Sequence, residues 1–204
     1  MDKLIDWAIE LQALAQNGLA YSKDKFDIER FNRIRDISAE MITQISDLEF
    51  KKVKDLFCCE SGYQTPKMDT RAVVFKDNKL LMVQEHDGRW TLPGGWIDVN
   101  SSIRANTIKE TKEEAGLDVK PVRLIALNDR KVQQMPPLAF GICKVFVLCE
   151  LLGGEFKDNI ETQGIGFFGG GELPSPIAEE KTSLNQLKMC FEAAHNPNWQ
   201  VIFD

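Results

Sequence analysis

Residues 93–117 read PGGWIDVNSSIRANTIKETKEEAGL, and the charges of this stretch decide how the chain is interpreted. A helix from about residue 102 to residue 115 fits its composition, with Asn100 or Ser101 as the N-cap. Glu110, Glu113 and Glu114 then lie at positions i, i+3 and i+4, on one face of that helix. In an isolated helix, each such pair of like charges costs roughly 0.2–0.5 kcal/mol.

The last two glutamates also occupy an unfavourable end of the helix. Glu113 and Glu114 precede Gly116, a residue that often ends a helix, so they lie where the helix dipole disfavours an anion by about 0.3–1 kcal/mol. A hard cation such as Mg²⁺ reverses these terms, because carboxylate oxygens are its preferred ligands. A solvated acidic face is the alternative. The turn Pro93–Gly95 favours the interpretation as a cation site over a solvated face. It lies just upstream of the helix, so its backbone and the carboxylates can face one ligand.

Composition narrows the classes of function. The chain has 204 residues, of which 43% are hydrophobic, and no apolar run is long enough for a bilayer. Without a signal-peptide core, we expect a cytoplasmic protein with no membrane partner. Five cysteines without a CxxC pair predict free thiols, and two histidines leave catalysis to carboxylates. The net charge of −6 argues against long nucleic acid as a partner.

The first 60 or so residues predict three amphipathic helices. In the first, apolar residues recur at three-and-four spacing from Leu4 to Ala15, and Gly18 is the expected C-cap. The second helix is expected to start after Asp27 and the third after Asp47. Because these helices have no evident core of their own, we expect them to dock on the rest of the chain or on a second copy of it.

From about residue 69 the pattern changes to strands. The runs TRAVVF and KLLMVQE flank Lys76-Asp77-Asn78, which predicts a hairpin. Further β-rich runs follow the acidic segment, and a helix capped by Thr182 or Ser183 ends the pattern. This order predicts an α+β fold with an N-terminal all-helical extension, divided into residues 1–62 and 63–204.

A glycine motif near residue 165 resembles a dinucleotide-binding fingerprint. Gly164, Gly166 and Gly169 have the G-x-G-x-x-G spacing, but Pro174 and Pro176 exclude the helix that must follow. We therefore reject a dinucleotide site. A glycine-rich surface loop is the better interpretation, with IGFFG as a possible short strand.

The acidic segment resembles the Nudix box, G-x5-E-x7-R-E-U-x-E-E-x-G-U, in which U is a bulky apolar residue. The chain reads Gly95-x5-Ser101-x7-Lys109-Glu110-Thr111-x-Glu113-Glu114-x-Gly116-Leu117. It departs from the family pattern at Ser101, Lys109 and Thr111. Residues 67–195 are similar to the wider Nudix layout, and the helical start resembles the subgroup that cleaves X-linked nucleoside diphosphates, including CDP-choline-cleaving members.

The resemblance implies a Nudix-type mixed β-sheet/α sandwich and a Mg²⁺-dependent pyrophosphohydrolase, with Mn²⁺ as a substitute. Its substrate would be a nucleoside diphosphate linked to X, of the CDP-choline, ADP-ribose or nucleotide-sugar type, cleaved to a nucleoside monophosphate and phospho-X. By the same resemblance, Glu110, Glu113 and Glu114 hold the metal, with the Gly94 carbonyl as a further ligand. Glu161 is the candidate carboxylate from outside the helix, as base or ligand.

The resemblance also implies substrate contacts. Arg71 and Glu85 would contact the substrate, Trp90 or Tyr63 would stack on the base, and Gly95 belongs to the same site. For each side chain an ordinary structural role is the alternative: an exposed strand arginine, a paired glutamate or a core aromatic.

The sequence also predicts an oligomeric state and leaves two other functions open. We expect a homodimer formed through the N-terminal helices. The departures at Ser101 and Lys109 leave open a non-catalytic nucleotide-binding module that regulates a partner. A Nudix enzyme acting on nucleoside triphosphates or RNA ends is a further alternative.

Overall fold

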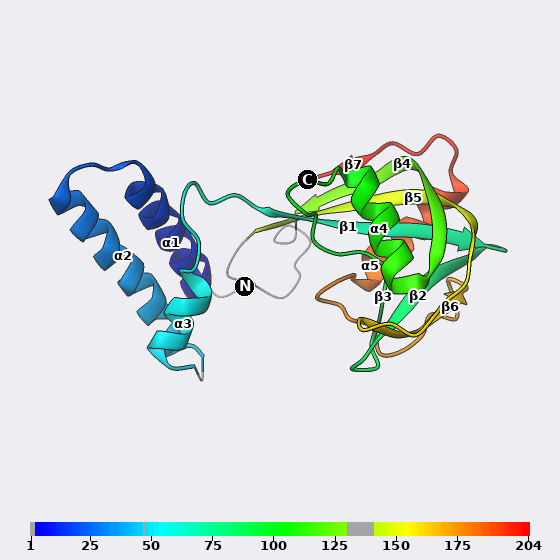
Figure 1. Ribbon diagram of the computed structural model, residues 1–204, viewed down its shortest axis with the longest axis horizontal. Helices are drawn as coiled ribbons and strands as arrows, with labels where there is room; N and C mark the ends of the chain where they lie inside the picture. Colours follow the sequence, from blue (N-terminus) through cyan, green and yellow to red (C-terminus); the bar gives the residue numbers. More distant parts are fainter. Residues whose placement is uncertain (1–2, 47, 130–140) are drawn as a thin grey trace. The chain divides into compact units, whose positions relative to one another are not determined.

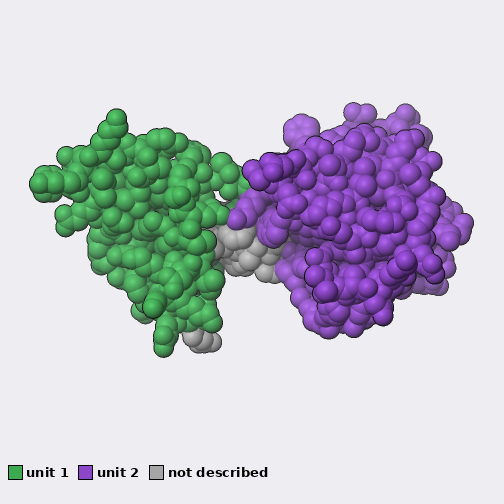
Figure 2. Space-filling view, in the orientation of Figure 1, with its two compact units in different colours: residues 1–66, 137–141 green, residues 67–136, 142–204 purple. Residues whose placement is uncertain are grey.

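The computed structural model describes residues 3–46, 48–129 and 141–204 (Figure 1). The chain forms two compact units, coloured separately in Figure 2. The first contains the residues up to Pro66 together with Gly141, and the second contains residues 67–129 and 142–204. Within these described ranges, no helix has the length and apolar character needed to cross a membrane.

The first unit consists of the helices α1 (Lys3–Tyr21), α2 (Lys25–Gln44) and α3 (Phe50–Phe57). Contrary to expectation, these helices share a small core of their own. Its buried apolar members are Ala8, Ala39, Val53, Phe57 and Cys58. The wide spacing of these residues along the chain explains why the core was not evident from any single helix.

Two helix boundaries in this unit differ from those predicted. Helix α1 continues through Gly18, because the missing side chain makes room for the ring of Phe31 on α2, whose atoms would lie 2.4 Å from a Cβ. Helix α2 begins earlier than expected, since Asp24 and not Asp27 precedes it, and the Asp24 carboxylate accepts two backbone N–H groups. The third predicted start, Asp47, lies outside the described residues.

The second unit is built on a seven-stranded mixed sheet. Its strands are β1 (Lys67–Lys76), β2 (Lys79–Glu85), β3 (Trp90–Thr91), β4 (Leu117–Asp129), β5 (Ile142–Gly154), β6 (Thr162–Phe168) and β7 (Ile202–Phe203). The strand order is β3-β2-β1-β5-β4-β7, and β6 pairs with β2. Strands β1 and β5 run parallel, whereas β4 and β5 run antiparallel. The predicted α+β fold with a helical extension is confirmed.

Two helices cover opposite faces of this sheet (Figure 1). Helix α4 (Ile103–Ala115) packs on one face, where Ala115 joins a core that includes Ala72 and Val145. Helix α5 (Leu184–His195) packs on the other, where Leu187 contributes to a core around Phe146. Alternate residues of the central strands thus feed two separate cores, as a sheet covered on both faces requires.

A tight turn joins β1 to β2, and two glycines lie within β6. Asp77 and Asn78 have φ angles of 51° and 60° between β1 and β2, which confirms the predicted hairpin. Gly164 and Gly166 lie in β6, so the surface-loop interpretation is wrong for them and the short strand is confirmed, whereas Gly169 follows the strand. Gly166 lacks a side chain where a Cβ would lie 2.5 Å from the ring of Phe168.

Three charged side chains are buried near the beginning of β1 and β5, on the face covered by α5. Arg71 Nη2 donates to Asp69 Oδ2 at 2.8 Å, and each of these side chains is 6% exposed. The Nζ of Lys144 lies 3.9 Å from the same carboxylate oxygen and also donates to the carbonyls of Glu180 and Lys181. One buried carboxylate therefore faces two buried cations.

Replacing Arg71 by methionine should destabilise the protein by about 3 kcal/mol, because among the described residues it leaves buried Asp69 with the more distant Lys144 as its charged partner. Arg89→Met is the matched control, since Arg89 forms its ion pairs with Asp87 and Glu180 at the surface, where a pair is worth about 1 kcal/mol or less. Urea denaturation measures both. Equal losses of unfolding free energy in the two variants would show that the buried Arg71–Asp69 pair stabilises the protein no more than a surface pair.

Candidate active site

The acidic segment forms helix α4, whose two ends are fixed by short side chains. Ser102 is the N-cap, and its hydroxyl accepts a hydrogen bond from the N–H of Ala105 at 3.1 Å. The predicted caps, Asn100 and Ser101, are therefore wrong. Gly116 ends the helix with a φ of 69°, the left-handed conformation that glycine adopts without strain.

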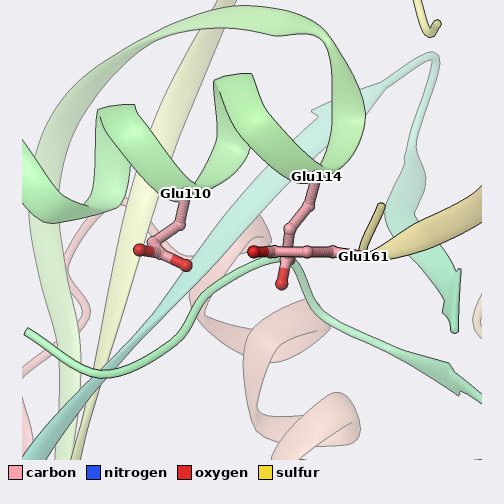
Figure 3. Close-up of side chains that lie close together, drawn as sticks. All are labelled: Glu110, Glu114 and Glu161. Atoms are coloured by element: carbon pink, nitrogen blue, oxygen red, sulfur yellow. The ribbon is translucent and has the colours of Figure 1, made fainter. Parts of the chain in front are cut away.

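Three carboxylates converge beside this helix. Glu110, Glu114 and Glu161 each offer an oxygen within 4.8 Å of the others. Figure 3 shows Glu110 and Glu114 on the same side of α4, one turn apart, with Glu161 approaching them from the chain that leads into β6. Glu113 is not in this group, because its side chain is 51% exposed and its Oε2 lies 3.7 Å from Lys109 Nζ. Of the three helix glutamates, the structure thus brings two together with Glu161.

Burial makes this cluster electrostatically costly. It raises the pKa of Glu114 to about 7, and the carboxylates of Glu110 and Glu161 act in the same direction. The N–H of Gly94, which donates to Glu114 Oε2 at 2.8 Å, and the charge of Arg71 oppose the rise. Burial also raises the pKa of Glu110. A raised pKa makes a carboxylate bind its proton more tightly, and a bound divalent cation competes with that proton.

The glycine turn before α4 lies directly against these carboxylates. A Cβ at Gly94, whose φ is 143°, would lie 1.9 Å from the carbonyl oxygen of Thr70. A Cβ at Gly95 would lie 2.7 Å from Glu110 Oε2. The Gly95 carbonyl accepts hydrogen bonds from Thr70 N at 2.9 Å and from Asn106 Nδ2 at 3.4 Å. Gly94 is therefore required by the backbone of Thr70 and by its positive φ, whereas a side chain at Gly95 would displace the Glu110 carboxylate.

Lys109 lies at the rim of the cluster. Its Nζ donates to Asp98 Oδ2 at 2.9 Å and to Glu110 Oε1 at 3.4 Å. The hydrogen bond to Asp98 is the main cause that raises the pKa of Lys109, and the contact with Glu110 adds to it. This lysine therefore remains charged and pairs with a cluster member. Asp98 was not singled out from the sequence, because no helical spacing connects it to α4.

Two predicted substrate contacts carry ion pairs in the structure. Arg71 is the buried partner of Asp69 described above, and its charge acts on Glu114 from within the unit. Glu85, at the end of β2, pairs with Lys181. The ion pair of Glu85 matches its structural alternative, whereas the burial of Arg71 contradicts the alternative of an exposed strand arginine. Contact with a substrate stays a prediction for both residues.

The predicted aromatic contacts lie in different units. Trp90 packs edge-on against Phe168, with ring centroids 5.0 Å apart, and so contributes to the core on the α5 face. Tyr63 is 65% exposed and belongs to the first unit. Stacking of either ring on a base stays a prediction, as does the role of the Gly94 carbonyl as a metal ligand.

Asn159 and Thr162 form part of the site that sequence reasoning missed. Both side chains contact the backbone carbonyl of Glu114, across the gap between α4 and the segment that carries Glu161. An asparagine two residues before a candidate carboxylate favours a local turn held by its side chain, which was the available signal. The contact with α4 is long-range and leaves no such signal.

The comparisons with known proteins cover both units. Residues 66–172 match the NUDIX domain model, and residues 2–57 match the model of the "UDP-X-like, N-terminal oligomerisation domain". The chain is 38% identical over 203 residues to the Bacillus subtilis (strain 168) protein named "Putative ADP-ribose pyrophosphatase YjhB", covering 99% of this chain and 97% of the relative.

Solved structures show the same relationship. The crystal structure of a UDP-X diphosphatase is 30% identical, covers 98% of each chain and has a TM-score of 0.64. An ADP-ribose pyrophosphatase from Streptococcus suis 89-1591 is 48% identical, covers 69% of this chain and 100% of its own, and also has a TM-score of 0.64. The chain therefore belongs to the Nudix hydrolase family and carries the N-terminal helical domain of its UDP-X-like members.

Proposed function

We propose that this Nudix hydrolase is a Mg²⁺-dependent pyrophosphohydrolase that cleaves a nucleoside diphosphate linked to X, of the ADP-ribose, CDP-choline or nucleotide-sugar type. The observation that carries the proposal is the convergence of Glu110, Glu114 and Glu161 beside the turn of Gly94 and Gly95. Relatives that match nearly the whole chain support the substrate class, since their names refer to ADP-ribose and to UDP-X.

The residues of the cluster fit a hard divalent cation. Three carboxylates offer oxygen atoms within 4.8 Å of one another, and oxygen is the ligand atom that Mg²⁺ prefers. We propose that Glu110, Glu114 and Glu161 hold the cation together with the Gly94 carbonyl, and that Mn²⁺ substitutes for Mg²⁺. When bound, such a cation neutralises phosphate charge and lowers the pKa of water. Glu113 would then act from the rim, beside Lys109.

The proposed reaction adds water across the diphosphate. A water oxygen bonds to one phosphorus, the bridging oxygen leaves with the bonding electrons on the other phosphate, and one proton is released. Glu161 is the most exposed of the three carboxylates, whereas Glu110 is buried and Glu114 is half-buried. Glu161 is therefore the cluster member best placed to pass that proton to solvent.

Glutamine substitutions along α4 test this assignment, because they keep the shape and remove the charge. Glu110→Gln and Glu114→Gln should each lower the rate by at least about 100-fold, since even the loss of a group that only supports a metal ligand can cost that much. Glu113→Gln should cost about fivefold or less, because its exposed pair with Lys109 is worth about 1 kcal/mol at most.

Initial rates with CDP-choline, ADP-ribose and a UDP-sugar, with and without Mg²⁺, measure these effects. Absence of metal-dependent turnover of every substrate would refute the proposed function. Tight nucleotide binding without product would then favour the non-catalytic nucleotide-binding module. Turnover of nucleoside triphosphates that is faster than turnover of these diphosphates would favour a Nudix enzyme acting on triphosphates. Equal losses for Glu113→Gln and Glu114→Gln would place Glu113 among the ligands.

The pH dependence of metal binding follows from the raised pKa of Glu114. Below a pKa of about 7 a proton occupies this carboxylate and competes with the cation, so affinity should increase as the pH rises through 7 and then level off. Between about pH 6 and pH 8 the ionised fraction grows about tenfold, and Mn²⁺ affinity measured by calorimetry should grow with it. Glu114→Gln, the control, should lose most of this slope. A flat profile in the unaltered protein would contradict the proposal.

We also propose that the first unit forms a homodimer, as the description of its matching domain model suggests. Helix α1 exposes Trp7, Leu14 and Tyr21, which are 55%, 56% and 70% exposed. Their seven-residue spacing places them on one side of the helix, away from the buried core residues. A second copy of this surface is the partner that we infer for the apolar stripe.

A charge in this stripe should prevent dimerisation. Leu14→Glu is expected to sediment as a monomer at micromolar protein concentration, because burying a carboxylate without a partner opposes association. Ala20→Glu is the matched control, since Ala20 is exposed on a different side of α1 and its substitution should leave the dimer intact. A monomeric unaltered chain would contradict the dimer, and dimers of both variants would exclude this stripe as its interface.

A further inference from the structure

The segment that carries Glu161 is folded around the side chain of Asn159. The Oδ1 of Asn159 accepts hydrogen bonds from the backbone N–H groups of Glu161 at 2.9 Å and Thr162 at 2.8 Å. This is the local turn that asparagine side chains form with the residues that follow them. The backbone position of Glu161 therefore depends directly on one amide side chain.

The same two residues connect this segment to the end of α4. Thr162, which is buried at the start of β6, donates from Oγ1 to the carbonyl oxygen of Glu114 at 2.6 Å. The Nδ2 of Asn159 donates to Thr162 Oγ1 at 2.9 Å and reaches the Glu114 carbonyl at 3.4 Å. The last carbonyls of a helix have no partner within it, so these side chains supply one that α4 lacks.

From these contacts we propose that Asn159 and Thr162 act as a clamp, a pair of positioning residues that fixes Glu161 relative to Glu110 and Glu114. The clamp holds Glu161 through its own N–H and Glu114 through its own C=O, so both ends of the contact belong to the carboxylate cluster. The inference rests on the proposed function, in which the three carboxylates share a cation.

Other contacts hold this segment less firmly. The side chain of Ile160 is 92% exposed and so contributes little packing. Its carbonyl lies 3.1 Å from Nε2 of His86, and the pairing of β6 with β2 begins only at Thr162, opposite Glu85. Loss of the clamp would therefore let the Glu161 segment shift. A displacement of about 1 Å at a catalytic centre can cost about 100-fold in rate, although the fold itself survives the loss of one or two hydrogen bonds.

A double-mutant cycle separates positioning from a purely structural role. Asn159→Ala is made in the unaltered protein and in Glu161→Gln, and Mn²⁺ affinity is measured by electron paramagnetic resonance beside kcat and KM for ADP-ribose. In the unaltered background we expect Mn²⁺ affinity and kcat to fall about tenfold or more. In the Glu161→Gln background the further loss should be less than about twofold, because the group being positioned is gone. Equal losses in both backgrounds, or none in either, would overturn the clamp.

Thr162 provides a matched pair of variants that does not depend on the folding of Asn159→Ala. Thr162→Val removes the hydroxyl at nearly constant shape, whereas Thr162→Ser keeps it. We expect Thr162→Val to show the same loss of Mn²⁺ affinity as Asn159→Ala, and Thr162→Ser to remain within about twofold of the unaltered protein. Urea denaturation verifies that both variants are folded. Equal Mn²⁺ affinities of the two variants would overturn the clamp.

Failure of the inference and failure of the proposed function give different results. An unaltered protein that binds no Mn²⁺ and hydrolyses no diphosphate would refute the proposed function. An unaltered protein that binds and hydrolyses normally, with the same fold-loss for Asn159→Ala in both backgrounds, would refute only the clamp.

Discussion

Mutual repulsion among Glu110, Glu114 and Glu161 is the interaction on which the arrangement of the second unit depends. Three carboxylates within 4.8 Å, one buried and one half-buried, are stable only if the surrounding structure holds them or a cation neutralises them. A backbone N–H group, the buried charge of Arg71 and the rim cation Lys109 oppose this repulsion. The N–H of Gly94 donates to Glu114, and Lys109 pairs with Glu110. Burial, with smaller contributions from Glu110 and Glu161, still raises the pKa of Glu114 to about 7, and a bound cation would favour its ionised form.

The fold places these groups on rigid elements that come from distant parts of the sequence. Helix α4 supplies two carboxylates, the glycine turn before it supplies a backbone that fits against them, and the chain just before β6 supplies the third. The glycine turn lies close to α4 and β1 because Gly94 and Gly95 have no side chain. Hydrogen bonds from Thr162 and Asn159 to the Glu114 carbonyl hold the segment before β6 against the end of α4. Contacts of this kind orient a site without adding charge to it.

Much of this could be predicted from local pattern. The α4 helix, the hairpin at Asp77 and Asn78, the C-terminal helix behind Ser183 and the family all followed from spacing, turn chemistry and motif. The caps of α2 and α4 were misplaced by one to three residues among neighbouring polar side chains, whereas two other errors involved contacts with distant residues. Gly18 was predicted to end the first helix, but α1 continues past it and the ring of Phe31 occupies the space of its missing side chain. The core of the N-terminal helices needed residues from three helices at once.

The sequence by itself determined which residues share a helix face and which glycines permit a close turn, because those properties depend on the local repeat and on the missing Cβ. Only the tertiary structure decided that Glu114 turns inward while its neighbour Glu113 pairs with Lys109 at the surface, and that Arg71 is buried against Asp69. Adjacent residues on a helix point about 100° apart, so what packs against each side selects between them. That selection is made by β1, β6 and the glycine turn, and it cannot be read from the helix alone.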